Sequence, residues 1–259
     1  MEARLDQLEM VLKTIAMQGN PNSPFWFMGL EESTDVEISA DDQILKQYRV
    51  AMAQNNGVPA ALTAARERTT YLPSWGGYIK LLFSVRDALL GSGARWCSED
   101  VKDYQRNKLG DLTVEEYSTC LLEFSPLPRK TRSHAWIYEK IAHRPGFEFL
   151  ETHEIYSKHT LVTERGEAIM SAVKQYQPRV LFVFGKDGEN ILKRKVNNLN
   201  SYDVVKDDKG QTLPAHIGAV DTSLIVFSYH PGALPPDRYW RELGAIVAGI
   251  LPIAPETAA

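Results

Sequence analysis

Residues 24–33 read PFWFMGLEES, and this stretch decides how the rest of the chain is interpreted. The apolar run at 25–28 lies between a proline and a glycine, which is typical of a strand buried on both faces of a sheet. Two carboxylates and a hydroxyl follow the glycine: Glu31, Glu32 and Ser33. Because ligands of α/β sheets bind at the carboxyl ends of parallel strands, this corner is a candidate site. The alternative is that the acids only begin a solvated helix, whose N-terminus favours negative charge.

Three later apolar runs have the same shape, at residues 120–124, 179–184 and 224–228. Helical patterns separate the runs, for example at 163–176 and 238–250. This alternation predicts an α/β fold, a three-layer αβα sandwich around a mostly parallel four-stranded sheet. Residues 197–215 predict a hairpin that turns near Asp208, Lys209 and Gly210. We expect the ends of the four strands to converge on one groove.

Length and composition predict a single domain over residues 1–259. The chain is 44% hydrophobic, which is enough for a sizeable core. A polar helical pattern at about 41–70, interrupted by an Asn-Gly turn and a proline, predicts a helical insertion. The formal net charge of −4 and the pI near 5.9 predict no overall basic surface. Any contact with nucleic acid must therefore come from a local group of cations.

Several features favour a cytoplasmic protein without a metal or cofactor. The two cysteines, Cys97 and Cys120, are too few for a zinc site or a disulfide framework. Residues 1–18 carry leucines at helical spacing, which predicts an amphipathic helix rather than a secretion signal, and no apolar stretch reaches the length of a membrane span. No histidine pair has metal-binding helical spacing, and the GKDG at 185–188 lacks the spacing of a nucleotide-binding loop.

Four motifs occur in a fixed order along the chain. A first strand ends in Gly-x-acid, a second in a Pro-rich basic loop, a third in Phe-Gly and a last in His-Pro. In order and spacing they resemble the uracil-DNA glycosylase superfamily, over about residues 24–250. The resemblance implies a monofunctional enzyme that flips a nucleotide out of DNA and hydrolyses its N-glycosidic bond, leaving an abasic site. DNA would be its partner, and no obligate protein partner is evident.

The resemblance implies two catalytic residues. Glu31 stands where the family has Asp or Asn and would orient a water and stabilise the sugar cation. His230 matches the histidine of the last motif and would donate a hydrogen bond to the departing base. Glu32 stands where the family usually has proline, so which of the two acids works stays open. A lone histidine at a strand end is equally compatible with a structural role.

The resemblance also implies contacts to DNA. From the second strand's loop, four side chains would touch phosphates or the base edge: Ser125, Arg129, Lys130 and Arg132. Gly232 would bring a backbone amide close to a phosphate. Leu234 stands where the family has the wedge that fills the gap in the base stack. Taken alone, the basic run would be a solvated face and the leucine an ordinary surface residue.

Two further positions bear on the substrate. Trp75, expected in a loop before a helix that starts at Gly76, resembles the aromatic that stacks on the flipped base in the family's iron–sulfur branch. A core tryptophan is an equal alternative, and two cysteines cannot hold that branch's cluster. Ser33 stands where the uracil-specific branch has a tyrosine that excludes substituents at the pyrimidine 5-position, so the pocket wall would be open.

Four functions follow from this pattern as hypotheses. The open wall, together with the lack of a base-reading Asn in the second loop, favours a pyrimidine with a bulky 5-substituent, such as the glucosylated hydroxymethylcytosine of phage DNA in bacterial defence. A catalytically silent DNA-binding or sensor module on the same fold is the first alternative. The second is a uracil-DNA glycosylase in base-excision repair. An enzyme of free nucleosides is weaker, because it would need neither Leu234 nor the basic loop.

Overall fold

The computed structural model describes residues 2–29, 38–55, 73–91, 96–107, 119–127, 135–229 and 235–251, without the side chains of 73–75, 186 and 187. In these residues one sheet of seven strands has the order β1-β3-β2-β4-β7-β6-β5. The strands are β1 (Met17–Gly19), β2 (Phe25–Gly29), β3 (Thr119–Glu123), β4 (Val180–Phe184), β5 (Asn197–Lys206), β6 (Thr212–Val220) and β7 (Ser223–Ser228). The α/β class is confirmed.

The expected four-stranded, mostly parallel sheet is wrong. The four expected strands do form a parallel centre, β3-β2-β4-β7, but β1, β6 and β5 extend it with antiparallel pairings, so the sheet is mixed. The three-residue β1 is too short to be recognised from sequence. The expected hairpin at 197–215 is part of this sheet, because its second strand β6 runs on to Val220 and turns directly into β7.

The hairpin turn itself lies where it was expected. Gly210 adopts a positive φ of 75°, a conformation that glycine reaches without steric cost. Asp207 fixes the turn, because its Oδ1 accepts hydrogen bonds from the backbone N–H groups of Lys209 and Gln211. An Asp that bonds the backbone two residues on is a common device of tight turns.

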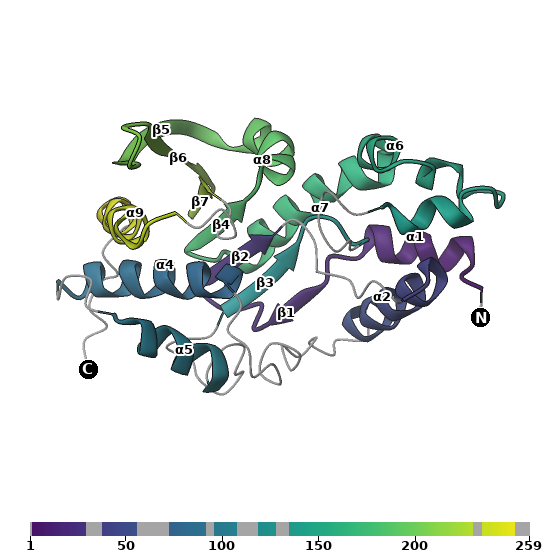
Figure 1. The fold of residues 1–259 in the computed structure, drawn as a ribbon, viewed down its shortest axis with the longest axis horizontal. Helices are drawn as coiled ribbons and strands as arrows, with labels where there is room; N and C mark the ends of the chain where they lie inside the picture. Colours follow the sequence, from purple (N-terminus) through teal and green to yellow (C-terminus); the bar gives the residue numbers. More distant parts are fainter. Residues whose placement is uncertain are drawn as a thin grey trace.

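Helices cover both faces of the sheet (Figure 1). The core on one face joins Trp26 and Met28 of β2 to α1 (Leu5–Lys13), α2 (Ala40–Asn55) and α7 (Thr160–Tyr176). On the other face, Phe25 and Phe27 pack with α4 (Pro73–Leu89), α5 (Ser98–Asn107) and α9 (Asp237–Ile250). Successive strand residues point to opposite faces, so a strand between two helical layers is apolar throughout.

Shorter helices complete the described part of the chain. They are η2 (Ile137–Ile141), η3 (Glu148–Leu150), α6 (His153–Lys158), α8 (Lys186–Leu192) and η4 (Lys193–Lys195). The amphipathic N-terminal helix is confirmed as α1, with Leu8 and Leu12 fully buried. Of the expected insertion at about 41–70, α2 covers the first part and packs on α1. No described helix combines the length and apolarity needed to span a membrane.

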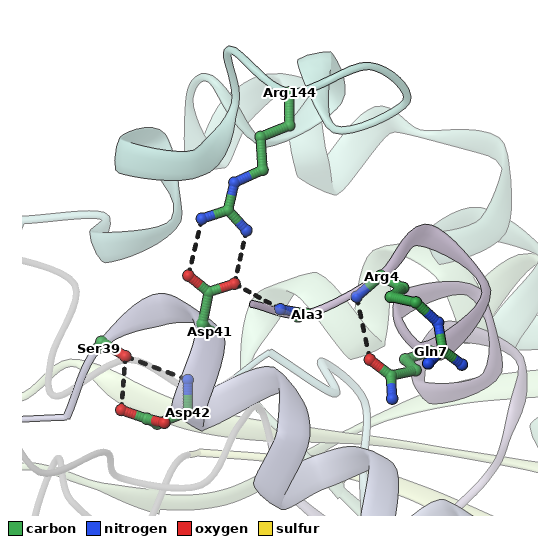
Figure 2. Close-up of polar contacts among 7 residues, drawn as sticks. All are labelled: Ala3, Arg4, Gln7, Ser39, Asp41, Asp42 and Arg144. Atoms are coloured by element: carbon green, nitrogen blue, oxygen red, sulfur yellow. Dashed lines mark hydrogen bonds and ion pairs between the residues drawn. The ribbon is translucent and has the colours of Figure 1, made fainter. Parts of the chain in front are cut away.

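An ion pair joins α2 to the segment after η2 (Figure 2). Asp41 accepts hydrogen bonds from Nη1 and Nη2 of Arg144, at 2.6 and 2.8 Å, and a third from the backbone N–H of Ala3 at 2.7 Å. Both charged side chains are mostly shielded from solvent. The hydrogen bonds from Arg144 hold the pKa of Asp41 below its usual value, and the bond from Ala3 adds to this. Three segments far apart in sequence are thus fixed at one point.

Candidate functional site

The four central strands bring their carboxyl ends to one edge of the sheet. Gly29 of β2 is level with Glu123 of β3, and Phe184 of β4 is level with Ser228 of β7. The β2–β4 pairing is parallel and joins the two pairs. We call these four strand ends the carboxyl edge; it is the edge at which α/β sheets bind ligands. Three motif segments follow these strands in the sequence. Segment 30–37 follows β2, 128–134 follows β3 after residues 124–127, and 230–234 comes just after β7.

Most of the sequence-predicted site lies beyond the described residues. This holds for Glu31, Glu32, Ser33, Arg129, Lys130, Arg132, His230, Gly232 and Leu234, whose roles stay predictions. Glu31 comes two residues after the end of β2, and His230 comes two residues after the end of β7. The side chain of Trp75 is also outside the described set, although its backbone is not.

Trp75 lies in the first turn of α4, which begins at Pro73 rather than at the expected Gly76. Proline suits the first turn of a helix, because the N–H that it lacks would have no partner there. One turn later, the hydroxyl of Tyr78 lies against Gly29, where an added Cβ would come within 3.2 Å of the oxygen. The N-terminal part of α4 therefore lies beside the end of β2.

Tyr78 belongs to an aromatic layer beneath the carboxyl edge. Its ring packs on Phe27 and Phe184, with ring centroids 5.4 and 4.7 Å away. Burial raises the pKa of the Tyr78 hydroxyl, and the negative charge of Glu123 raises it further. Tyr78 is therefore a neutral phenol at physiological pH. These packed rings make the α4 side of the carboxyl edge apolar.

Ser125 is the one predicted base-binding side chain that the structure describes. It is buried, and its hydroxyl lies 3.3 Å from the carbonyl oxygen of Leu127 and 3.1 Å from the hydroxyl of Tyr156. The ring of Tyr156 packs in turn on Trp136 at 5.0 Å. The Ser125 hydroxyl thus makes hydrogen bonds inside the protein, just before the basic loop. A contact between Ser125 and a base stays a prediction.

Arg165 of α7 fixes the end of β3. Its Nε and Nη2 donate to the carbonyl oxygens of Phe124 and Glu123, at 2.8 and 3.0 Å, and its Nη1 donates to those of Leu12 and Thr14, both at 2.8 Å. Burial lowers the pKa of Arg165 to about 10, so the guanidinium is still charged at neutral pH. A buried charge is tolerated when such hydrogen bonds compensate its lost hydration.

The structure adds three side chains at this edge that sequence reasoning missed. Glu123 ends β3 beside Gly29, and Tyr229 follows β7 directly. His216 of β6 lies opposite Phe227, with its Nε2 3.8 Å from a carboxylate oxygen of Glu189. The signal for Tyr229 was its place before the His-Pro motif. His216 could not be found, because β6 was not assigned to the sheet.

Within the described ranges, no three His, Cys, Asp or Glu side chains are grouped so that they could hold a metal ion. Comparison with protein-family models, with curated proteins and with solved structures found no significant match.

Proposed function

We propose that this protein is a DNA glycosylase that resembles the uracil-DNA glycosylase superfamily. One observation carries the proposal: the four strands that bear the motifs are neighbours, parallel and level at one edge. The strands before Glu31 and His230 are separated by β4 alone, which amounts to about 10 Å, or two strand spacings. An acid that follows one of these strands and an imidazole that follows the other could act on the sugar and on the base of one extruded nucleotide.

The chemistry divides between these two residues. When the N-glycosidic bond breaks, the sugar acquires positive charge and the departing base acquires negative charge. Glu31, or its neighbour Glu32, would stabilise the sugar cation and orient the attacking water. His230 would donate a hydrogen bond to the base and stabilise its developing charge. The bond lies inside the base stack, so the nucleotide must first be flipped out.

For the substrate, we propose a pyrimidine with a large 5-substituent. Ser33 replaces the tyrosine that closes the pocket in the uracil-specific branch, and residues 124–134 contain no asparagine to read uracil. Glucosylated hydroxymethylcytosine in phage DNA fits such an open pocket, which would give the protein a role in bacterial defence. A uracil-DNA glycosylase of base-excision repair shares the chemistry and differs only in the pocket.

The test uses three DNA substrates in parallel: phage DNA with glucosylated hydroxymethylcytosine, the same DNA without the modification, and DNA containing uracil. Alkali-labile abasic sites are counted in each. We expect them in the modified DNA alone. Release from uracil DNA alone would overturn the substrate and keep the enzyme class, whereas no release from any of the three would overturn the enzyme class.

Point variants assign the roles. We expect Glu31→Gln and His230→Ala each to lower base release about 10²- to 10⁴-fold while DNA binding is retained. Glu32→Gln is the matched control for Glu31→Gln, since it removes an adjacent carboxylate. If Glu32→Gln is the more damaging of the two, the working acid is Glu32. Binding by the wild type without any base release would identify a silent DNA-binding module.

A further inference from the structure

Tyr229 is unusual among the aromatic residues that the structure describes. Its side chain is 37% exposed, and every other described Phe, Tyr and Trp with an assigned side chain is buried or half-buried. It also stands at a special place, one residue beyond β7 and directly before His230. A partly exposed ring at the edge where α/β sheets bind ligands offers a flat apolar face to a ligand.

The position of Tyr229 is fixed by Tyr239 of α9. The two rings meet edge to face, with centroids 5.8 Å apart and an interplanar angle of 89°. The Tyr229 backbone N–H donates to the Tyr239 hydroxyl at 3.5 Å, and that hydroxyl donates to the carbonyl oxygen of Pro214 in β6 at 3.3 Å. Tyr239 is fully buried. Contacts with Tyr239 therefore hold the Tyr229 ring in place, and Tyr239 in turn links α9 to β6 and to the end of β7.

We infer that Tyr229 is a stacking surface for a DNA base at the carboxyl edge, beside the flipped nucleotide. The inference rests on the proposed function. A base presents a flat π face, and an aromatic side chain stacks on any of the four bases. The phenol hydroxyl of Tyr229 can both donate and accept a hydrogen bond, so it suits a phosphate or a base edge.

Stacking also suits the charge of this protein. With a formal net charge of −4, the chain gains little overall attraction to the DNA backbone. The phosphate contribution to affinity falls steeply with salt, whereas a stacked aromatic pair depends on contact rather than on charge. Tyr229 would therefore supply affinity that persists at physiological ionic strength.

Two measurements test this directly. The protein is first irradiated with DNA that carries one 5-iododeoxyuridine, and the cross-linked peptide is identified by mass spectrometry. We expect the cross-link at Tyr229. Fluorescence anisotropy then compares DNA affinity among variants: Tyr229→Phe keeps the ring and should bind within about twofold of wild type, whereas Tyr229→Leu should bind about tenfold more weakly at every salt concentration.

Tyr202→Leu is the matched control, since Tyr202 is a half-buried tyrosine on the outer strand β5, and it should bind DNA like the wild type. Thermal unfolding checks that each variant is folded. Wild-type affinity in Tyr229→Leu, with no cross-link at Tyr229, would overturn the inference even if base release is intact. Weakened binding in Tyr229→Leu by a protein that releases no base would support Tyr229 as a DNA contact and overturn only the glycosylase. A protein that binds no DNA would overturn both.

Discussion

The Nε atom of Arg165 lies 2.8 Å from the carbonyl oxygen of Phe124, one residue past the end of β3. The same guanidinium bonds carbonyl groups at the end of α1. One buried side chain of α7 therefore holds the N-terminal helix and the start of the basic loop in a fixed relation. The backbone at Glu123 and Phe124, from which the basic loop continues, is therefore fixed by Arg165.

Replacing Arg165 by methionine tests this relation. Arg165→Met keeps much of the apolar stem and leaves the carbonyl groups without donors, so we expect the free energy of unfolding to fall by about 3–5 kcal/mol. Urea denaturation measures it. Arg194→Met, at an exposed arginine of η4, is the control and should change stability by less than about 0.5 kcal/mol. Equal denaturation midpoints for the two variants would contradict the assignment.

The contact between α4 and α9 depends on Gly244. A Cβ at this position would lie 2.4 Å from Cβ of Ser84 and 2.9 Å from the backbone nitrogen of Val85. We expect Gly244→Ala to destabilise the protein by about 1–3 kcal/mol, because the two helices must move apart. Gly249 lies on the same helix with open space around it, so Gly249→Ala should be neutral or stabilising by up to about 1 kcal/mol. Thermal unfolding that ranks the two variants in the opposite order would refute this packing.

Asp41 should make stability depend on pH. Its pKa is lower in the folded protein than the ordinary value of 3.8, chiefly because of Arg144. Its contribution is therefore present above that ordinary value and is lost as the pH falls through the folded pKa. At pH 7 we expect Asp41→Asn to cost about 1–2 kcal/mol, and the difference from wild type should shrink as the pH falls below about 4.

The exposed pair of Arg4 and Asp6 is the control for Asp41. Its two side chains are 67% and 66% exposed, and solvent-exposed ion pairs of this kind contribute little. Asp6→Asn should therefore shift the urea midpoint at pH 7 much less than Asp41→Asn does. A loss at Asp41→Asn that is the same at pH 3 and pH 7 would show that the pair with Arg144 is not its source.

Ser33→Tyr tests the substrate proposal. If Ser33 leaves the pocket wall open, a tyrosine there should hinder pyrimidines with bulky 5-substituents. We expect at least about a tenfold loss of kcat/KM on glucosylated hydroxymethylcytosine, equivalent to about 1.4 kcal/mol. Ser33→Ala keeps the space open and should retain the activity. Full activity of Ser33→Tyr on the modified DNA would place the substituent elsewhere.

The sequence by itself determined the four central strands and the expectation that their ends meet at one edge. The four strands were evident because each lies between two helical layers, so both of its faces must be apolar and the run is continuous. The turn at Gly210 and the amphipathic helix α1 were evident for similarly local reasons. The candidate acids and His230 were found from motif order, which depends on the resemblance and not on geometry.

Tertiary structure alone decided the rest. In the described part of the chain the sheet has seven strands because β1 pairs with β3 and the β5–β6 hairpin pairs with β7. Neither the three-residue β1 nor the β6–β7 pairing leaves a local signal in the sequence. In the sequence Arg165 looks like an ordinary helical cation. In the structure it donates to five carbonyl groups from residues up to 154 positions away in the chain. Likewise Tyr229 becomes the exposed ring at the carboxyl edge only once α9 places Tyr239 beneath it. Such contacts are set by packing between distant segments, whereas sequence patterns report only the periodicity of each segment by itself.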